Sequence, residues 1–368
     1  MRQAKKHRKK LVFTVTNDLV YDQRMIRICS SLQNHSYDVI LVGRKMRKSP
    51  PLSNQHYRQK RLHCFSENGK LFYFEYNLRL FFFLLFQNCD LVCAIDLDTI
   101  LPCYFVSIFR NKERVYDAHE LFCEMKEVVT RPAVYRFWKR IEKFAVPRFK
   151  HGYTVNAPIR DIFKNEYGVS YETIMNVPVM TNENGRPRED FIIYQGAVNH
   201  GRSFETLIPA FQWIDCAFHI YGGGNFMDEC HELVEKFHLH DKIIFKGKVA
   251  PQELKAITGT ALLGVTLFEN NGLNNYYSLG NRFFDYIHAG IPQVCVDYPA
   301  YKAINDEFEI AVLISDLTPQ SIANAINSLL SNVALQDKLR DNCRKARLVY
   351  NWQNEEKKLV QFYQRILD

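Results

Sequence analysis

The stretch Tyr277–Pro292, YSLGNRFFDYIHAGIP, decides the fold of the second half of this chain and indicates a site within it. Gly280 and Asn281 are predicted to form a turn and the N-cap of a short helix. Gly290 and Pro292 are expected to end that helix, because glycine adopts the left-handed C-cap conformation and proline cannot continue a helix. A buried strand is expected to follow directly.

The predicted helix, Arg282–His288, carries a basic and an acidic side chain three residues apart on one side. Arg282 adds positive charge to a helix N-terminus, which already favours anions. Asp285 can accept hydrogen bonds from sugar hydroxyls. A phosphate beside a diol is typical of a nucleotide sugar. The alternative is a capped surface helix in which the two residues only form an ion pair.

The composition predicts more than one packed core. The chain has 368 residues, of which 47% are hydrophobic and 14% aromatic, and this length favours about two domains. Ten scattered cysteines without a C-x-x-C pair indicate reduced thiols rather than disulfides or a zinc site. The longest apolar run, Leu78–Phe86, is too short to cross a membrane, and the N-terminal apolar stretch, which stops at Asn17, is too short for a signal peptide. We therefore expect a cytoplasmic protein.

The net charge of +8 is concentrated near the beginning of the chain. Basic clusters occur at Arg2–Lys10, Arg44–Lys48 and Arg58–Arg61. This asymmetry suits an anionic membrane surface or an acidic substrate, and solvated loops are the alternative. No recognition helix, RNA-binding strand or zinc finger is visible, so nucleic acid is not an expected partner.

Strand and helix patterns alternate along almost the whole chain, which predicts an α/β fold. A polar segment at 176–189, with two prolines and a glycine, reads as a linker between two such patterns. We therefore predict two doubly wound, Rossmann-like domains facing a cleft, over residues 1–180 and 188–350. In this architecture ligands bind outside the carboxyl ends of the strands. The expected strands are 11–16, 39–42, 91–95, 115–116 and 153–155, then 191–194, 217–221, 243–245, 262–266 and 294–296.

Glycine-rich loops follow two of the predicted strands in the second half. Gly222, Gly223 and Gly224 would let the backbone approach a phosphate, and a tight turn without a ligand is the alternative. The full dinucleotide fingerprint fails because its third glycine would stand at Met227, so neither a nicotinamide nor a flavin cofactor is expected. Gly196 lies in the other loop.

The loop around Gly196 also contains a candidate phosphate-binding cation. Arg202 stands where that loop joins a predicted helix, within reach of a diphosphate lying over the loop. The alternative is an ordinary arginine in the first turn of that helix.

Candidate chemistry in the first half lies at the ends of two predicted strands. His119, flanked by acids in DAHE, can donate to a sugar hydroxyl or share a proton; a structural histidine is the alternative. Asp96 and Asp98 form an Asp-x-Asp triplet that could hold Mg²⁺ or Mn²⁺ against a diphosphate. Either acid can instead cap the helix expected at Thr99.

Taken in order along nearly the whole chain, these segments resemble GT-B glycosyltransferases of glycosyltransferase family 4, of the kind that builds bacterial surface polysaccharide. Each motif alone is weak, and their order is specific. The segments that carry the resemblance include AIDLDT (94–99), DAHE (117–120), YQG (194–196), YGGG (221–224) and SLGNRFFDY (278–286).

The resemblance implies roles for the candidate residues. Asp285 replaces the family's usual glutamate and would hold the nucleotide ribose, while Arg282 replaces a lysine and Arg202 matches a phosphate contact. His119 matches the histidine that touches the donor sugar. The glycine loops and Asn281 would surround the nucleotide. The C-terminal helix, 355–368, would cross back onto the first domain.

The chain departs from the family pattern at the sugar-contacting acid. The family's paired acids stand eight residues apart, but Tyr277 stands eight before Asp285. Glu269 is a candidate with the wrong spacing, so Glu269 and Tyr277 are both candidate sugar contacts. Asp285 is also one methylene shorter than glutamate, and Gly280 stands where similar sequences often have proline.

The resemblance therefore implies a retaining, metal-independent hexosyltransferase, and no cofactor is expected. Its donor would be a nucleoside diphosphate sugar, with UDP expected, and its acceptor a growing glycan or a lipid-linked molecule. Peripheral binding to the inner face of an anionic membrane is a further expectation. The alternatives are a metal-dependent transferase that uses Asp96 and Asp98, and a non-catalytic nucleotide-sugar-binding assembly protein.

Overall fold

The computed structural model describes residues 8–20, 22–181 and 187–367. The chain divides into unit 1, Met1–Asn176 with Glu355–Asp368, and unit 2, Val177–Asn354. Most of the basic cluster Arg2–Lys10 lies outside the described residues. Among those that are described, no helix is long and apolar enough to span a bilayer.

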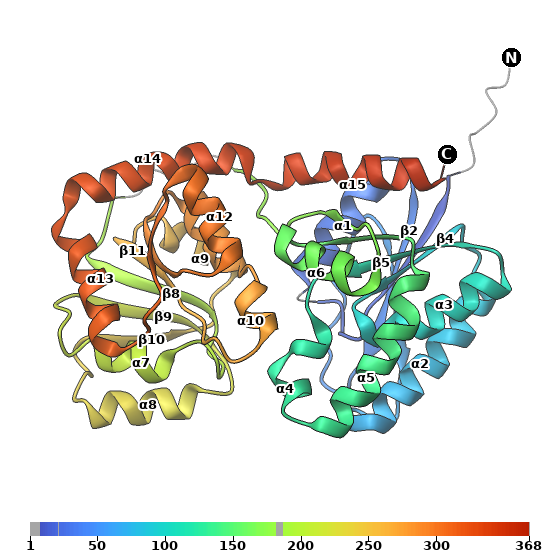
Figure 1. The fold of residues 1–368 in the computed structure, drawn as a ribbon, viewed down its shortest axis with the longest axis horizontal. Helices are drawn as coiled ribbons and strands as arrows, with labels where there is room; N and C mark the ends of the chain where they lie inside the picture. Colours follow the sequence, from blue (N-terminus) through green and yellow to red (C-terminus); the bar gives the residue numbers. More distant parts are fainter. Residues whose placement is uncertain (1–7, 21, 182–186, 368) are drawn as a thin grey trace, which may run out of the picture. The chain divides into compact units, whose positions relative to one another are not determined.

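Unit 1 is built on one parallel sheet, which within the described residues has seven strands in the order β3-β2-β1-β4-β5-β6-β7 (Figure 1). The central strands are short apolar runs that are buried on both faces, as expected where helices cover both sides of a parallel sheet. The strands are β1 (Lys10–Thr14), β2 (Asp38–Lys45), β3 (Arg58–His63), β4 (Leu91–Ile95), β5 (Glu113–Ala118), β6 (His151–Thr154) and β7 (Glu172–Thr173).

The basic cluster Arg58–Arg61 lies in a strand rather than in a solvated loop. It forms most of β3, an outer strand that pairs in parallel with β2. Its sequence, RQKRLH, lacks an apolar pattern, and its side chains remain exposed or half-buried. An edge strand tolerates such side chains, since charged residues there also discourage pairing with other chains.

Two helices of unit 1, α1 and α6, show recognisable caps. Asp22 accepts a hydrogen bond from the backbone of Met25 at the start of α1, and Gly168 ends α6 in the left-handed conformation. The helices are α1 (Gln23–Asn34), α2 (Gly69–Phe86), α3 (Ile100–Phe109), α4 (Lys126–Val129), α5 (Pro132–Ala145), α6 (Ala157–Tyr167) and α15 (Trp352–Leu367), with short 3₁₀ turns at Leu97–Thr99, Phe122–Glu124 and Val146–Arg148.

Helix α15 packs on unit 1 from Glu355 onward. The buried ring of Tyr363 lies 6.3 Å from Tyr153 and 5.8 Å from Phe13, measured between centroids. Glu355, also buried, accepts a hydrogen bond of 2.8 Å from the backbone of Met175. The end of the chain is therefore part of the core of the unit that contains its beginning.

Unit 2 contains a second parallel sheet, whose described strands number six in the order β10-β9-β8-β11-β12-β13 (Figure 1). The strands are β8 (Phe191–Ala197), β9 (Ala217–Gly223), β10 (Ile243–Gly247), β11 (Leu263–Thr266), β12 (Gln293–Val296) and β13 (Ala311–Ile314). The helices are α7 (Phe204–Ala210), α8 (Met227–Lys236), α9 (Pro251–Thr258), α10 (Leu273–Tyr277), α11 (Asn281–Ala289), α12 (Pro299–Phe308), α13 (Pro319–Ser331) and α14 (Val333–Val349).

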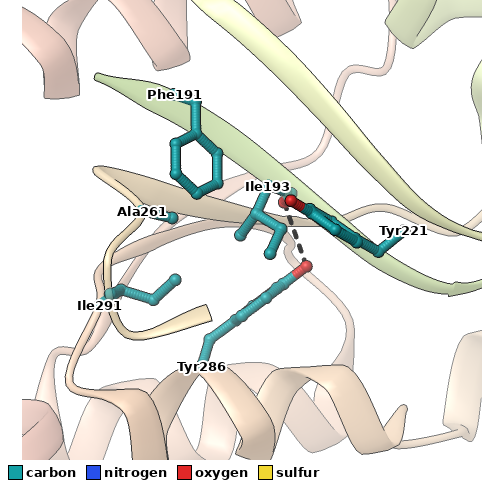
Figure 2. Close-up of a cluster of buried hydrophobic side chains, with 6 residues drawn as sticks. All are labelled: Phe191, Ile193, Tyr221, Ala261, Tyr286 and Ile291. Carbon is teal, nitrogen blue, oxygen red and sulfur yellow. Dashed lines mark hydrogen bonds between the residues drawn. The ribbon is translucent and has the colours of Figure 1, made fainter. Parts of the chain in front are cut away.

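One buried cluster fixes helix α11 against this sheet. Tyr286 packs among Phe191, Ile193 and Ile291, and its hydroxyl donates to the backbone carbonyl of Ile193 in β8 at 3.1 Å (Figure 2). Gly264 makes room for the ring, since a Cβ there would stand 2.5 Å from Tyr286. The residues on the preceding turns of α11 are consequently held at the carboxyl end of β8.

Candidate functional site

The two glycine loops of unit 2 pack backbone against backbone. A Cβ on Gly222 would stand 1.8 Å from the carbonyl oxygen of Gly196, and one on Gly224 would stand 2.1 Å from that of Val198. Neither position can hold a larger residue without moving the other loop. Close packing of the loops therefore accounts for these two glycines, whether or not a phosphate binds there. Gly223 has no such close contact, since its Cβ would meet only Lys248 at 3.4 Å.

Arg282 is a buried cation beside the first of these loops. Its guanidinium carbon lies 3.9 Å from the ring centroid of Tyr194 in a cation–π contact. Its Nη2 stands 3.7 Å from where a Cβ on Gly196 would be, and the φ angle of Gly196, 116°, is one that L side chains rarely adopt. The side chain is only 8% exposed, yet Nη1 has no hydrogen-bond partner among the described residues. A buried donor without a partner is costly, so an acceptor bound beside this loop would stabilise the side chain.

A second guanidinium lies against a ring that Arg282 also approaches. The guanidinium carbon of Arg202 is 4.5 Å from the ring centroid of Phe268, and that of Arg282 is 5.4 Å from the same ring. Both charges act on the hydroxyl of Tyr301, whose pKa is nevertheless raised because burial dominates. The structure therefore brings the two predicted phosphate contacts together around Phe268. Planar guanidinium groups held by aromatic rings suit recognition of phosphate.

Asp285 lies on the same helix but has different neighbours. Its carboxylate accepts a hydrogen bond of 2.9 Å from the side-chain amide of Gln195, the residue before Gly196. The amide oxygen of Gln195 accepts in turn from the hydroxyl of Thr258 at 2.6 Å. This chain of bonds fixes the carboxylate at the end of β8, and it remains partly exposed. A carboxylate so held can accept hydrogen bonds from a diol.

The beginning of α11 corrects one detail of the sequence prediction. Gly280, not Asn281, is the N-cap, and Asn281 is the first residue of the helix. The backbone N–H of Gly280 donates to the hydroxyl of Tyr301 at 2.8 Å, so it is not available to an anion. The helix ends as predicted, with Gly290 in the left-handed conformation at a φ angle of 68°.

The candidate sugar contacts lie in the segment between β11 and α11. The backbone N–H of Glu269 donates to the carbonyl of Gly201, and its carboxylate accepts from Asn271 at 2.9 Å. Glu269 therefore lies beside the loop that carries Arg202. The carboxyl of Glu205 lies close by, and burial together with Glu269 raises its pKa. Tyr277 ends α10, where its ring contacts Tyr276.

The histidine and acids of unit 1 gather at the carboxyl ends of β4 and β5. Nδ1 of His119 lies 3.2 Å from Oδ1 of Asp96. The pKa of Asp96 is raised well above its ordinary value by burial and by the nearby carboxylate of Glu120, so this carboxyl group holds a proton more readily than an exposed aspartate would. The φ angle of Asp96 is 55°, an uncommon conformation that residues at functional sites often adopt.

Neither acid of the Asp-x-Asp triplet caps a helix with its side chain, which corrects the capping interpretation. Asp98 accepts from the hydroxyl of Thr16 at 2.6 Å, and burial raises its pKa to about 6. Helix α3 begins at Ile100. In the part of the chain that the structure describes, no group of three or more His, Cys, Asp or Glu side chains is placed to hold a metal ion.

The sequence did not reveal the side chains that contact the predicted site residues and fix their positions. The rings of Tyr194 and Phe268 contact the arginines, Gln195 holds Asp285, and Tyr301 bonds to the backbone N–H at the beginning of α11. These partners come from separate strands and helices, so no local spacing connects them. Only the position of Gln195, at the end of a predicted strand before a glycine, gave a usable signal.

Two doubly wound units, each built on one parallel α/β sheet, define the GT-B class of protein. Residues 179–346, nearly all of unit 2, match the family model of glycosyl transferases group 1. The domain formed by these residues belongs to that family of glycosyltransferases. No curated protein matches it in sequence.

Solved structures agree with this fold at low sequence identity. The chain is similar to sucrose-phosphate synthase from Thermosynechococcus elongatus, with a TM-score of 0.77, 16% identity, and coverage of 98% of this chain and 99% of that chain. HepE from Anabaena, solved with UDP and glucose, has a TM-score of 0.77 at 12% identity, covering 97% and 100%. WaaG, a glycosyltransferase involved in lipopolysaccharide biosynthesis, has 0.71 at 13% identity, covering 95% and 98%.

Proposed function

We propose that this glycosyltransferase transfers a hexose from a UDP-hexose donor to a hydroxyl of a growing glycan or lipid-linked acceptor. The observation that carries the proposal is the buried guanidinium of Arg282, whose Nη1 lacks a partner beside the glycine loops. A diphosphate supplies the missing acceptor. HepE, a structural neighbour, was solved with UDP-glucose, which supports the choice of base.

Each residue has a role in this proposal. Arg282 and Arg202 hold the diphosphate, and Asp285, fixed by Gln195, accepts from the ribose hydroxyls. His119, held by Asp96, donates to a hydroxyl of the transferred sugar. Glu269 and Tyr277 remain candidate sugar contacts. The glycines of both loops and Asn281 are proposed to surround the nucleotide.

In the reaction, the bond from the sugar C1 to the β-phosphate oxygen breaks, and a bond from C1 to the acceptor oxygen forms. The proton of the acceptor hydroxyl passes to the departing diphosphate, as the resemblance implies for a retaining transferase. Negative charge grows on the diphosphate as the bond breaks, and fixed guanidinium groups stabilise such charge best in the transition state. No metal or other cofactor takes part in the proposed step, and the protein is proposed to work in the cytoplasm, at the inner face of a membrane.

The test is donor hydrolysis by the purified protein, since many transferases slowly pass the sugar to water. We expect UDP-glucose or a related UDP-sugar to release UDP, and GDP-sugars to release little GDP. The Arg282→Met variant serves as a control for contaminating hydrolases. A protein that binds UDP tightly but hydrolyses no UDP-sugar, with or without acceptor glycans, would be the non-catalytic binder instead.

A further inference from the structure

Unit 1 carries an apolar groove that the proposed donor chemistry does not use. It lies on helices α2, α3 and α5 of this unit, of which α3 contacts both of the others (Figure 1), and its volume is about 660 Å³. Apolar and aromatic side chains form nearly all of its wall, among them Phe74, Leu78, Phe81, Phe105 and Phe137. The volume lies within the range of small-molecule sites.

We propose that this groove binds the hydrocarbon chain of an anionic, lipid-linked acceptor. The inference rests on the proposed function and names the acceptor class. The apolar wall disfavours an extended peptide, because its backbone would bring N–H and C=O groups that need partners. The side-chain N–H groups of Asn77, one of the few polar residues there, already donate to Tyr73 and Asp98. A hydrocarbon chain needs no hydrogen-bond partners.

The polar end of the groove coincides with the chemistry of unit 1. Asp98 lines the groove and lies beside Asp96, whose carboxylate faces His119. Lys70, in the first turn of α2, lines it too, whereas Phe81 lies eleven residues further along the helix, or roughly 16 Å along its axis. The lining is therefore polar near the carboxyl ends of the strands and apolar along the rest of α2.

The charge around the groove suits a phosphate-bearing lipid. Lys70 lines the groove, whereas Arg136, Arg140 and Lys143 are exposed on α5 outside its lining. Among the residues that the structure describes, none of these four side chains is ion-paired with a carboxylate. Cations with no internal counter-charge beside an apolar wall complement a lipid with an anionic headgroup.

Exposed aromatic side chains continue from the apolar end of the groove. Phe82 is 51% exposed and Phe86 is 82% exposed on α2, and Phe109 at the end of α3 is 68% exposed. The rings of Phe82 and Phe109 both lie against Phe81 in the groove wall, 5.6 and 6.3 Å away between centroids, and exposed apolar side chains that gather in this way mark an interaction site. A lipid whose chain enters the groove would leave the bilayer at this surface.

The test uses the full chain and farnesyl monophosphate below its micelle-forming concentration, titrated by calorimetry and by the emission of Trp138, which lines the groove. Ala133, exposed in the first turn of α5, lines it as well, so Ala133→Phe should fill it without disturbing the core. Ala157→Phe makes the same change at an exposed site in the first turn of α6, outside the groove.

We expect saturable binding by the wild type, a loss of at least about tenfold in Ala133→Phe, and no change in Ala157→Phe. Lys70→Gln should weaken farnesyl phosphate by a few-fold and leave farnesol unaffected. No saturable binding, or equal binding by both phenylalanine variants, would overturn the proposal. Sedimentation with anionic vesicles, without uptake of farnesyl phosphate, would instead make this surface a bilayer contact.

A separate titration with UDP distinguishes failure of the groove from failure of the proposed function. Ala133→Phe should bind UDP as the wild type does. Intact farnesyl phosphate binding in a protein that neither binds UDP nor hydrolyses UDP-sugars would refute the transferase reaction and leave the groove assignment standing. Normal UDP binding without groove binding would refute the groove alone.

Discussion

Replacing Arg282 with methionine separates a ligand-binding arginine from a structural one. The change removes the charge and the donors while keeping much of the buried volume. Hydrogen bonds to charged groups contribute about 1.5–3 kcal/mol each, so losing two at the lower figure costs about 3 kcal/mol, or about 100-fold in UDP affinity. The weakening should appear in a calorimetric titration with UDP.

The same variant should keep its stability, and this makes the prediction specific. The contact with Tyr194, at 3.9 Å, contributes about 0.5–2 kcal/mol, whereas a buried donor without a partner costs about 1–3 kcal/mol. The two effects offset each other, so the melting temperature should stay within about 3 °C. Arg340→Met is the matched control, since Arg340 is buried in the same unit and donates to the carbonyl of Leu262; its UDP affinity should not change. Unchanged UDP affinity in Arg282→Met, or a loss that merely follows a fall in melting temperature, would refute the reasoning.

Three further predictions concern unit 1 and the metal question. His119→Ala should lower kcat by roughly 100-fold and leave the UDP dissociation constant unchanged; equal losses in both would contradict its placement at the sugar. Burial raises the pKa of Asp98 to about 6, so ionising it in the folded protein costs stability as pH rises through that value. Asp98→Asn should therefore stabilise the protein at pH 8, by roughly 3 kcal/mol, with the gain shrinking towards pH 4; a melting-temperature difference that does not depend on pH would argue against a buried ionisation. Turnover should survive EDTA, and activity that is lost on chelation and restored by Mn²⁺ would favour the metal-dependent alternative.

The sequence predicted the alternation of strands and helices because most of its strands are short apolar runs and some of its helices end at a recognisable glycine. Gly290 illustrates this, since its left-handed conformation ends α11 where predicted. The hydrophobic pattern did not reveal β3, because this edge strand buries little and its polar side chains give no strand signal. Elements that owe their structure to pairing rather than burial cannot be found from hydrophobic patterns.

The candidate site divides in the same way. Arg202, Arg282 and Asp285 could be selected from local spacing, because each stands near a predicted loop or helix start. The rings that contact the arginines could not be selected in this way, because Tyr194 and Phe268 are far from them in the sequence. Gly222 was selected as a phosphate-binding glycine, but its packing against the other loop is enough to explain why glycine stands there.

The central claim is that unit 2 binds the nucleotide through Asp285 as well as through the arginines. The most direct measurement is a calorimetric titration of the full chain with UDP, in the wild type, Asp285→Asn and Asp285→Glu. We predict binding by the wild type, a loss of about tenfold or more in Asp285→Asn, at least comparable binding in Asp285→Glu, and nearly equal melting temperatures. Equal UDP affinity in the wild type and Asp285→Asn, with only a small loss of stability from the altered bond to Gln195, would contradict the account.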